Sequence, residues 1–277
     1  MLLKTERIQK SIVRVRKFLK KKPKRPAPEK IHQLRTSVRR LESSLEVMDV
    51  GAKKLKKRLT RNLAILRKRL GKIRDMDVFT DHAISVGSTT SDRECLVQLL
   101  EYLGTKRSRQ AKKLRNASKA AAPQLERDLR NLHEALQEAA SDSGPNTQPV
   151  IASRSDSDVP LRDLAADLDH PAVLHRGNLH PYRLKVKEFR YLLQLSEEEH
   201  SRKLINELGE VKDAIGEWHD WEELVLIARN VVRQGGRSKL IRQLKKTADA
   251  RFSKAVTVAQ HLRKTVRDGK FPSPLPS

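Results

Sequence analysis

The stretch IHQLRTSVRRLE, residues 31–42, carries an apolar face and a basic face on what reads as a single helix. At about 100° per residue, Arg35 and Arg39 fall within about 60° of His32 around the helix axis. The apolar residues centre on the opposite side, and they are Leu34, Val38, Leu41 and Leu45. This spacing is typical of an amphipathic helix, so the stretch predicts one packed side and one separate cationic side.

The same 3.6-residue period runs through most of the chain, and no alternating strand pattern of useful length occurs. We therefore expect an all-α protein. The first helix has Ile8, Ile12, Val15 and Leu19 on one face, and ends at KKKPKRPAPEK. A second helix is expected from Pro28 to Asp49, and a third after Gly51, where Leu55, Leu59, Leu66, Leu70 and Ile73 align. A fourth helix and a possible fifth are expected over about 91–140. The segment LRDLAADL predicts a short helix, and the helical pattern returns over about 181–195, 200–230 and 237–267.

Two segments of the chain match each other in polarity. HQLRTSVRRLESSL begins at His32 and HPYRLKVKEFRYLL begins at His180, 148 residues later. LGKIRDMDVF and IGEWHDWEEL also match, and their glycines, Gly71 and Gly216, are 145 residues apart. Two markers at nearly one offset predict a duplicated helical unit. We expect a first half over 1–140, a linker over 141–170 that contains SDSGPNTQPVIASRSDSD, a second half over 171–268 and a loose tail over 269–277.

Positive charge is concentrated at the start of the chain. The 277 residues hold 59 Lys and Arg against 34 Asp and Glu, a net charge of +25. Residues 1–75 alone hold 26 basic and 6 acidic residues, a net charge of +20. Such a field attracts polyanions, namely nucleic acid, anionic lipid or a polyphosphate.

Several classes of protein are disfavoured by the composition. No run of about 18 apolar residues occurs, so we expect no membrane-spanning helix. The first 20 residues are charged throughout, unlike a secretory signal, and we expect a cytoplasmic protein. Cys95 is the single cysteine, which excludes an internal disulfide, and its neighbours CLVQLL indicate a core position. We expect no cofactor and no resident metal.

The second copy repeats the cationic stripe. His180, Arg183 and Lys187 fall together, with Arg190 beside them. The opposed apolar face holds Tyr182, Val186, Phe189 and Leu193. Exposed helices ordinarily interleave acids and bases, whereas both stripes here are purely basic, which favours an anionic ligand. Both histidines lie in or next to the first helical turn, where free backbone N–H groups suit phosphate.

These motifs together resemble the CHAD domain, the conserved histidine α-helical domain. The resemblance rests on HxxRxxxRR in 32–40, HxxRxxxKxxRY in 180–191, and RDxD (74–77) and HDxE (219–222), each following a glycine. It extends over nearly the whole chain, from the first helix to about residue 267. It implies two similar four-helix bundles related by a pseudo-two-fold axis, with a basic central pore that binds inorganic polyphosphate. The phosphate-binding residues that it implies are His32, Arg35, Arg39, Arg40, His180, Arg183, Lys187 and Arg190.

The sequence departs from the family pattern at two positions. Pro181 follows the second histidine directly, and Glu188 stands where Arg40 would have a basic counterpart. Arg40 also falls off the first stripe in the angular comparison. Further basic residues on neighbouring helices are weaker candidates for the same surface, and they are Arg7, Arg14, Lys54, Arg58, Arg61, Lys203 and Lys212.

Three functions fit the charge. The first is non-catalytic binding of inorganic polyphosphate, with targeting to polyphosphate deposits as the family resemblance suggests. The second is binding of RNA or DNA through the backbone, although stacking aromatics are few, with aromatic residues at 4%. The third is a polyphosphate-processing enzyme that holds Mg²⁺ at Asp75 and Asp77, or at His219, Asp220 and Glu222. Helix geometry points residues two apart about 200° apart, so pairing of these acids with basic neighbours is the favoured interpretation.

Overall fold

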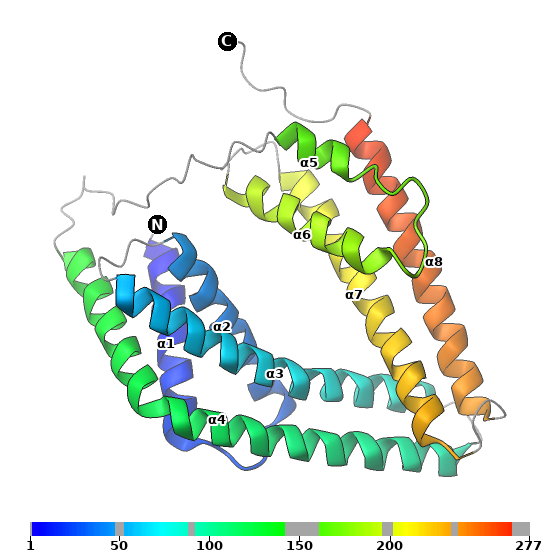
Figure 1. Cartoon of the computed structure of the whole chain (residues 1–277), viewed down its shortest axis with the longest axis horizontal. Coiled ribbons are helices and arrows are strands. Elements are labelled where there is room, and N and C mark those ends of the chain that lie inside the picture. Colours follow the sequence, from blue (N-terminus) through cyan, green and yellow to red (C-terminus); the bar gives the residue numbers. More distant parts are fainter. Residues whose placement is uncertain are drawn as a thin grey trace. The chain divides into compact units, whose positions relative to one another are not determined.

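The computed structural model describes residues 2–47, 53–87, 92–141, 161–195, 202–233 and 238–267. Within these residues the regular structure is all α-helical, with no strand (Figure 1). The helices are α1 (Leu2–Lys21), α2 (Pro28–Val47), α3 (Lys53–Gly87), α4 (Arg93–Ser141), α5 (Leu161–Asp167), α6 (Leu179–Leu195), α7 (Arg202–Val231) and α8 (Lys239–Arg267). The predicted all-α class is confirmed. The end of the predicted second helix, the linker 141–158 beyond Ser141 and the tail lie outside the described residues.

Local sequence explains where the first helices end and begin. The α1 helix ends in Lys20 and Lys21, whose charges favour the negative end of the helix dipole. Lys22 then takes a left-handed conformation with φ of 41°, and its N–H donates to the Phe18 carbonyl at 2.9 Å. Pro28 stands at the first position of α2, where a missing N–H has no consequence.

The stretch 93–141 forms one helix, so the possible fifth helix in this region is not present. Pro123 lies inside α4 and lacks the N–H that would donate one turn back, and Figure 1 shows α4 bent. In sequence, a proline after three alanines is difficult to distinguish from a break between two helices. The core contacts on both sides of Pro123 keep the chain helical through it.

The chain divides into two compact units. Unit 1 is Met1–Thr80 with Glu101–Asp156, and unit 2 is Asp81–Leu100 with Ser157–Ser277. The segment Asp81–Leu100, which the sequence analysis assigns to the first half, therefore groups with the second. It belongs there because His82 stacks on Trp221 at 4.1 Å between ring centroids and Gln98 accepts a hydrogen bond from the Arg233 N–H at 3.2 Å.

The core of unit 1 draws on all four of its helices. Its apolar stripe on α2 is buried as predicted, and so is the leucine row of α3. The core residues are Ile12, Val15 and Leu19 of α1; Ile31, Leu34, Val38, Leu41 and Leu45 of α2; Leu59, Leu63, Leu66, Leu70 and Ile73 of α3; and Ala111, Leu114, Ala122, Leu125, Leu129 and Leu132 of α4. Burying a side chain of this size stabilises the fold by about 1.5 to 3 kcal/mol.

The core of unit 2 lies among α5, α6, α7 and α8, and α7 packs along both α6 and α8. The predicted apolar face of α6 is buried, including the full side chains of Tyr182 and Phe189. The short α5, which lies inside the segment assigned to the linker, contributes Ala165 to this core. Cys95, predicted to be a core residue, is buried with 1% of its surface exposed.

Candidate anion-binding faces

The α2 helix turns its basic stripe away from the core of unit 1. His32, Arg39 and Arg40 are exposed, and Arg35 is half-buried. The predicted division of this helix into an apolar and a cationic side is therefore correct. Arg35 differs from its neighbours on the stripe, because it leans onto the adjacent helix α3 and forms a hydrogen bond there.

Arg35 is positioned by a glycine of α3. Its Nη1 donates to the carbonyl of Arg67 at 3.4 Å. A Cβ at Gly71, one turn after Arg67, would lie only 2.8 Å from the same Nη1. The guanidinium group can reach the α3 backbone because position 71 has no side chain.

Several guanidinium groups act on one another around Arg35. Burial and the charge of Arg39 lower the pKa of Arg35 below its ordinary value, and Arg67 and Arg74 act in the same direction. Asp75 opposes them, and Glu42 accepts from Arg67 Nε with 2.8 Å between N and O. Because four guanidinium groups meet two carboxylates, this region of unit 1 carries excess positive charge that an anion would stabilise. Arg67 and Arg74 did not emerge as site residues from the sequence, because their proximity to Arg35 depends on how α2 and α3 pack.

The α6 helix of unit 2 presents its own basic stripe. His180 and Lys187 are exposed, while Arg183 and Arg190 are half-buried. Arg183 Nε donates to the carbonyl of Lys212 on α7 at 2.9 Å. Arg190 Nε donates to the carbonyl of Ile205, one heptad earlier on α7, at 3.1 Å.

The arrangement around Arg183 matches the one around Arg35. Lys212 precedes Gly216 by one turn, as Arg67 precedes Gly71, and a Cβ at Gly216 would lie 3.1 Å from Arg183 Nη2. Each unit thus holds one arginine of its stripe against the backbone of the next helix at a glycine. The duplicated glycines were noted in the sequence as markers of a repeat. Their equal spacing was the sequence signal that marked these positions. Their role in letting an arginine lie against the backbone, which we call seating the arginine, depends on packing between helices.

Two histidines meet in unit 2. The rings of His180 on α6 and His219 on α7 have centroids 5.3 Å apart and are tilted by 48°. His219 Nε2 also lies 3.9 Å from a carboxylate oxygen of Glu223 on its own helix. In the sequence, His219 is a candidate metal ligand and the first residue of the HDxE motif. Its position beside the stripe histidine comes from the packing of α6 on α7.

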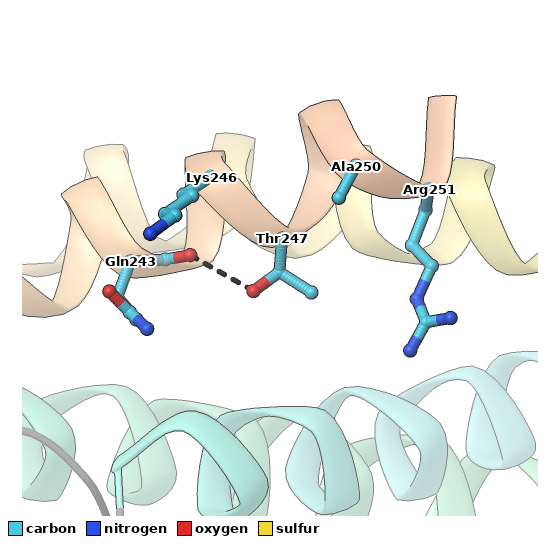
Figure 2. A pocket seen from close by; sticks show the side chains of 5 residues that line it. All are labelled: Gln243, Lys246, Thr247, Ala250 and Arg251. Carbon is cyan, nitrogen blue, oxygen red and sulfur yellow. Dashed lines mark hydrogen bonds between the residues drawn. The ribbon is translucent and has the colours of Figure 1, made fainter. Parts of the chain in front are cut away.

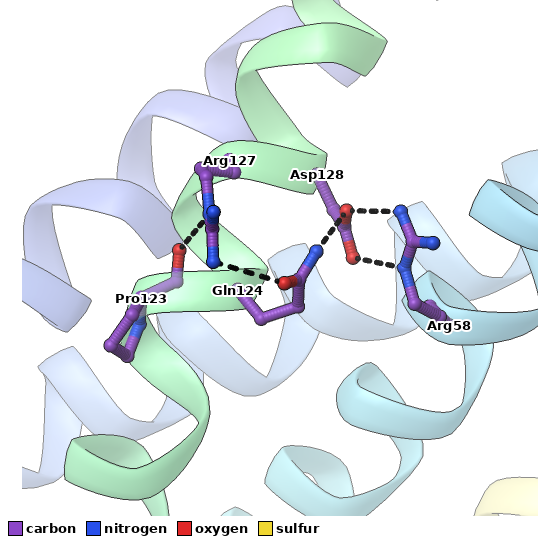
Figure 3. A network of polar contacts seen from close by, with 5 residues as sticks. All are labelled: Arg58, Pro123, Gln124, Arg127 and Asp128. Carbon is purple, nitrogen blue, oxygen red and sulfur yellow. Dashed lines mark hydrogen bonds and ion pairs between the residues drawn. The ribbon is translucent and has the colours of Figure 1, made fainter.

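The weaker candidates differ in their surroundings. Arg58 is held by buried Asp128, with Nη2 at 2.8 Å and Nε at 3.3 Å from the carboxylate oxygens (Figure 3). This ion pair raises the pKa of Arg58 and directs its charge to α4. Lys212 pairs with Asp213 at 2.9 Å, and Arg14 donates to the Ser37 hydroxyl at 3.2 Å. The remaining weaker candidates are exposed, and they are Arg7, Lys54, Arg61 and Lys203.

The acids of the two short acidic segments point in different directions. Asp77 is buried and accepts a hydrogen bond from Arg107 of α4, whereas Asp75 is exposed on the other side of α3. Glu222 of α7 pairs with Arg176, which also pairs with Asp249 of α8. Among the described residues, no group of three or more His, Cys, Asp or Glu side chains is placed to hold a metal ion. The expected pairing of Asp77 and Glu222 with basic neighbours is thus present.

An open cavity of about 230 Å³ lies along α8 (Figure 2). Its lining residues lie on successive turns of one face, and they are Gln243, Lys246, Thr247, Ala250 and Arg251. The Thr247 hydroxyl donates back to the Gln243 carbonyl at 3.1 Å, and Arg251 pairs with Glu217 of α7 at 3.2 Å. Two of the polar side chains that line this cavity, those of Thr247 and Arg251, are therefore engaged within unit 2.

None of the described helices is long and apolar enough to cross a membrane. Among curated proteins, none matches this chain. The family model of the CHAD domain matches residues 12–229, a range that includes both cationic stripes and both glycine positions. The chain belongs to the CHAD domain family.

Proposed function

We propose that this chain binds inorganic polyphosphate without converting it, through one cationic face in each unit. The face of unit 1 comprises His32, Arg35, Arg39 and Arg74. The face of unit 2 comprises His180, Arg183, Lys187 and His219. CHAD domains are associated with polyphosphate binding, which supports this choice of ligand.

The observation that supports the proposal most directly is the set of arginines around half-buried Arg35. The positive charges of these arginines repel one another. The lowered pKa of Arg35 reflects burial first and that repulsion second. A guanidinium group can hold two phosphate oxygens at once, and several in one place suit a ligand that carries charge on every unit. Gly71 permits the seating of Arg35 before any ligand arrives.

Polyphosphate fits these faces better than nucleic acid does. Proteins that hold single strands place aromatic side chains beside the basic ones, so that the bases can stack. Here Trp218, Trp221 and Phe189 are buried in unit 2, and Phe79 is buried on α3. A ligand with no bases has no need of such side chains. In the cell, such binding would recruit the protein to polyphosphate deposits in the cytoplasm.

The proposal is tested by titrating the protein with long-chain polyphosphate, heparin, single-stranded RNA and duplex DNA at two salt concentrations. The variant changes Arg35, Arg39, Arg183 and Lys187 to Ala. A matched control changes Lys112, Lys113, Arg130 and Lys264 to Ala, which removes the same charge from exposed positions elsewhere. By analogy with DNA, binding that neutralises about 6 to 10 phosphates loses roughly 10³- to 10⁵-fold in affinity between about 50 and 200 mM salt.

We expect polyphosphate to bind more tightly than the other polyanions, the stripe variant to lose this preference while it stays helical, and the control to keep it. Equal affinity for every polyanion, with stripe and control variants alike, would reject the two faces as binding sites. Release of phosphate from the polymer in the presence of Mg²⁺, abolished by Asp75→Ala or Asp220→Ala, would support an enzyme instead.

A further inference from the structure

The two units differ at one position of their otherwise matching faces. Counted from the glycine that seats the arginine, the third residue is Arg74 in unit 1 and His219 in unit 2. Arg74 lies close enough to Arg35 to lower its pKa. His219 lies beside His180, with 5.3 Å between ring centroids. Unit 1 therefore carries a permanent cation where unit 2 carries an imidazole.

An imidazole is the side chain whose charge ordinarily changes between about pH 5 and 8, whereas a guanidinium group stays charged throughout. Two imidazoles close together disfavour double protonation when nothing else is near, because the two positive charges repel. A phosphate beside both rings reverses this effect by stabilising each charge. Binding of a polyanion at such a pair should therefore take up protons.

The other charged groups around His219 leave it open to such a ligand. A carboxylate oxygen of Glu223 lies 3.9 Å from His219 Nε2, and both side chains are about half exposed, at 42% and 48%. An exposed pair one turn apart contributes little and is screened by salt. The corresponding residue of unit 1 is Val78, which has no charge.

The charged groups of the neighbouring elements point to other partners. From α8, Arg251 pairs with Glu217 and Asp249 pairs with Arg176. From the segment before α6, Arg176 also pairs with Glu222. On α6, Arg183 donates to the Lys212 carbonyl, and Lys212 pairs with Asp213. From α3, His82 stacks on Trp221. Among these contacts of the described residues, His180 is the group from another helix that meets the His219 ring.

We propose that His180 and His219 form a phosphate-binding pair that makes polyphosphate binding by unit 2 strengthen as the pH falls, while unit 1 depends on pH much less. This inference rests on the proposed function and assigns His219 to the binding face. It also predicts that the two units contribute unequally: unit 1 holds the polymer at every physiological pH, and unit 2 adds to the affinity in mildly acidic conditions.

The test measures the affinity of the full chain for long-chain inorganic polyphosphate between about pH 8 and pH 5.5 at constant ionic strength. Long chains are used because their internal phosphates keep a constant charge over this range. For the wild type we expect affinity to rise by about 2- to 30-fold, as two exposed ion pairs would give. His180→Gln with His219→Gln should remove most of this rise, so that the affinity changes little between the two ends of the pH range.

Reciprocal exchanges between the units sharpen the test. His219→Arg gives unit 2 the residue of unit 1, and should raise the affinity at pH 8 and flatten the pH profile. Arg74→His gives unit 1 an imidazole, and should lower the affinity at pH 8 and steepen the profile. His261→Gln, at an exposed histidine of α8, is the matched control and should change neither. Glu223→Gln removes the competing carboxylate and should tighten binding at low pH.

A second measurement detects the protons that are taken up when the ligand binds. The observed heat of binding at about pH 7 should vary with the ionisation enthalpy of the buffer, because protons are taken up with the ligand, and this dependence should shrink in His219→Arg. Tight binding with one pH profile for the wild type, His219→Arg and the double glutamine variant would overturn the inference and leave the proposed function intact. Absence of polyphosphate binding at every pH would overturn both.

Discussion

Half-burial of Arg35 and Arg183 changes what these residues can do compared with the exposed cations around them. A guanidinium group has five N–H donors in a fixed plane, so one hydrogen bond to a carbonyl orients the plane and leaves capacity for phosphate. The Arg67 and Lys212 carbonyls provide that orientation at 3.4 and 2.9 Å. A side chain that is already ordered loses less entropy when a ligand binds, so these two arginines should contribute more than exposed Arg39.

Gly71 and Gly216 should therefore matter for binding and not for stability. A Cβ at Gly71 would lie 2.8 Å from Arg35 Nη1, and a flexible side chain can move away from it at little cost. We expect Gly71→Ala to keep or raise the free energy of unfolding, by up to about 1 kcal/mol from helix propensity. The affinity for polyphosphate should fall by about 3- to 10-fold, because the guanidinium group loses its position. Gly216→Ala should act in the same direction but less strongly, since its contact is 3.1 Å.

The control for this pair is Gly104→Ala on α4, where an added Cβ would meet nothing within 4 Å. It should give the same gain in helix stability and leave binding unchanged. Thermal unfolding and binding titrations on the three variants separate the two effects. If Gly71→Ala bound polyphosphate as the wild type does, the seating of Arg35 would have no part in recognition.

At the scale of the helix, the start of α8 depends on a residue that lies far away in sequence. The Asp92 carboxylate accepts hydrogen bonds from the Leu240 N–H at 3.1 Å and the Ser238 hydroxyl at 2.9 Å. These two bonds, the backbone one first, lower the pKa of Asp92. Asp92 precedes α4, so this contact joins the beginnings of two helices within unit 2.

The lowered pKa predicts the sign of a pH effect on stability. A carboxyl group with a lower pKa in the folded state stabilises the fold fully above its unfolded pKa, near pH 4. That contribution is lost as the pH falls through the folded value. Asp92→Ala should therefore lower the urea midpoint at pH 7, and the difference from the wild type should shrink below about pH 4. Asp92→Asn can still accept both hydrogen bonds, so its urea midpoint at pH 7 should lie between those of the wild type and Asp92→Ala.

Asp81→Ala, at an exposed position of the same unit, serves as the control and should show no such dependence on pH. The prediction would be wrong if the urea midpoints of the wild type and Asp92→Ala differed by the same amount at pH 7 and pH 3. The charge of the carboxylate would then not be what stabilises the start of α8.

The sequence predicts those features of a helix that depend only on the spacing of its own residues. The apolar stripes of α2 and α6 were placed correctly, because leucine spacing and burial follow from one helix alone. The possible break within 91–140 was not, because tertiary packing carries α4 through Pro123. The seating of Arg35 at Gly71 and the contact of His180 with His219 join different helices. Their geometry depends on how the helices pack, which residue spacing within one helix cannot determine.

At the scale of the whole molecule, the charge of +25 provides attraction to any polyanion, and the two faces would have to provide selectivity. Excess charge spread over a surface acts alike on heparin, RNA and polyphosphate. Arginines seated on a backbone and paired imidazoles act only on a ligand that reaches them. The chain carries such a face in each of its two units, so a long polymer that engages both at once would be held more tightly than a short one.

This avidity gives the last prediction. Arg35→Gln with Arg39→Gln disables unit 1, and Arg183→Gln with Lys187→Gln disables unit 2. With inorganic triphosphate, too short to be shared, each variant should halve the number of bound ligands and leave the affinity of the remaining face unchanged. With long-chain polyphosphate, each variant should lower the affinity by about 10²-fold or more, because the second contact made by one chain is lost. The control variant that lacks Lys112, Lys113, Arg130 and Lys264 measures the loss of affinity that is due to net charge alone. The contrary result is that both variants lose affinity for triphosphate and for long-chain polyphosphate by the same small factor. The two faces would then bind separately, and the duplication would increase the number of ligands bound without any avidity.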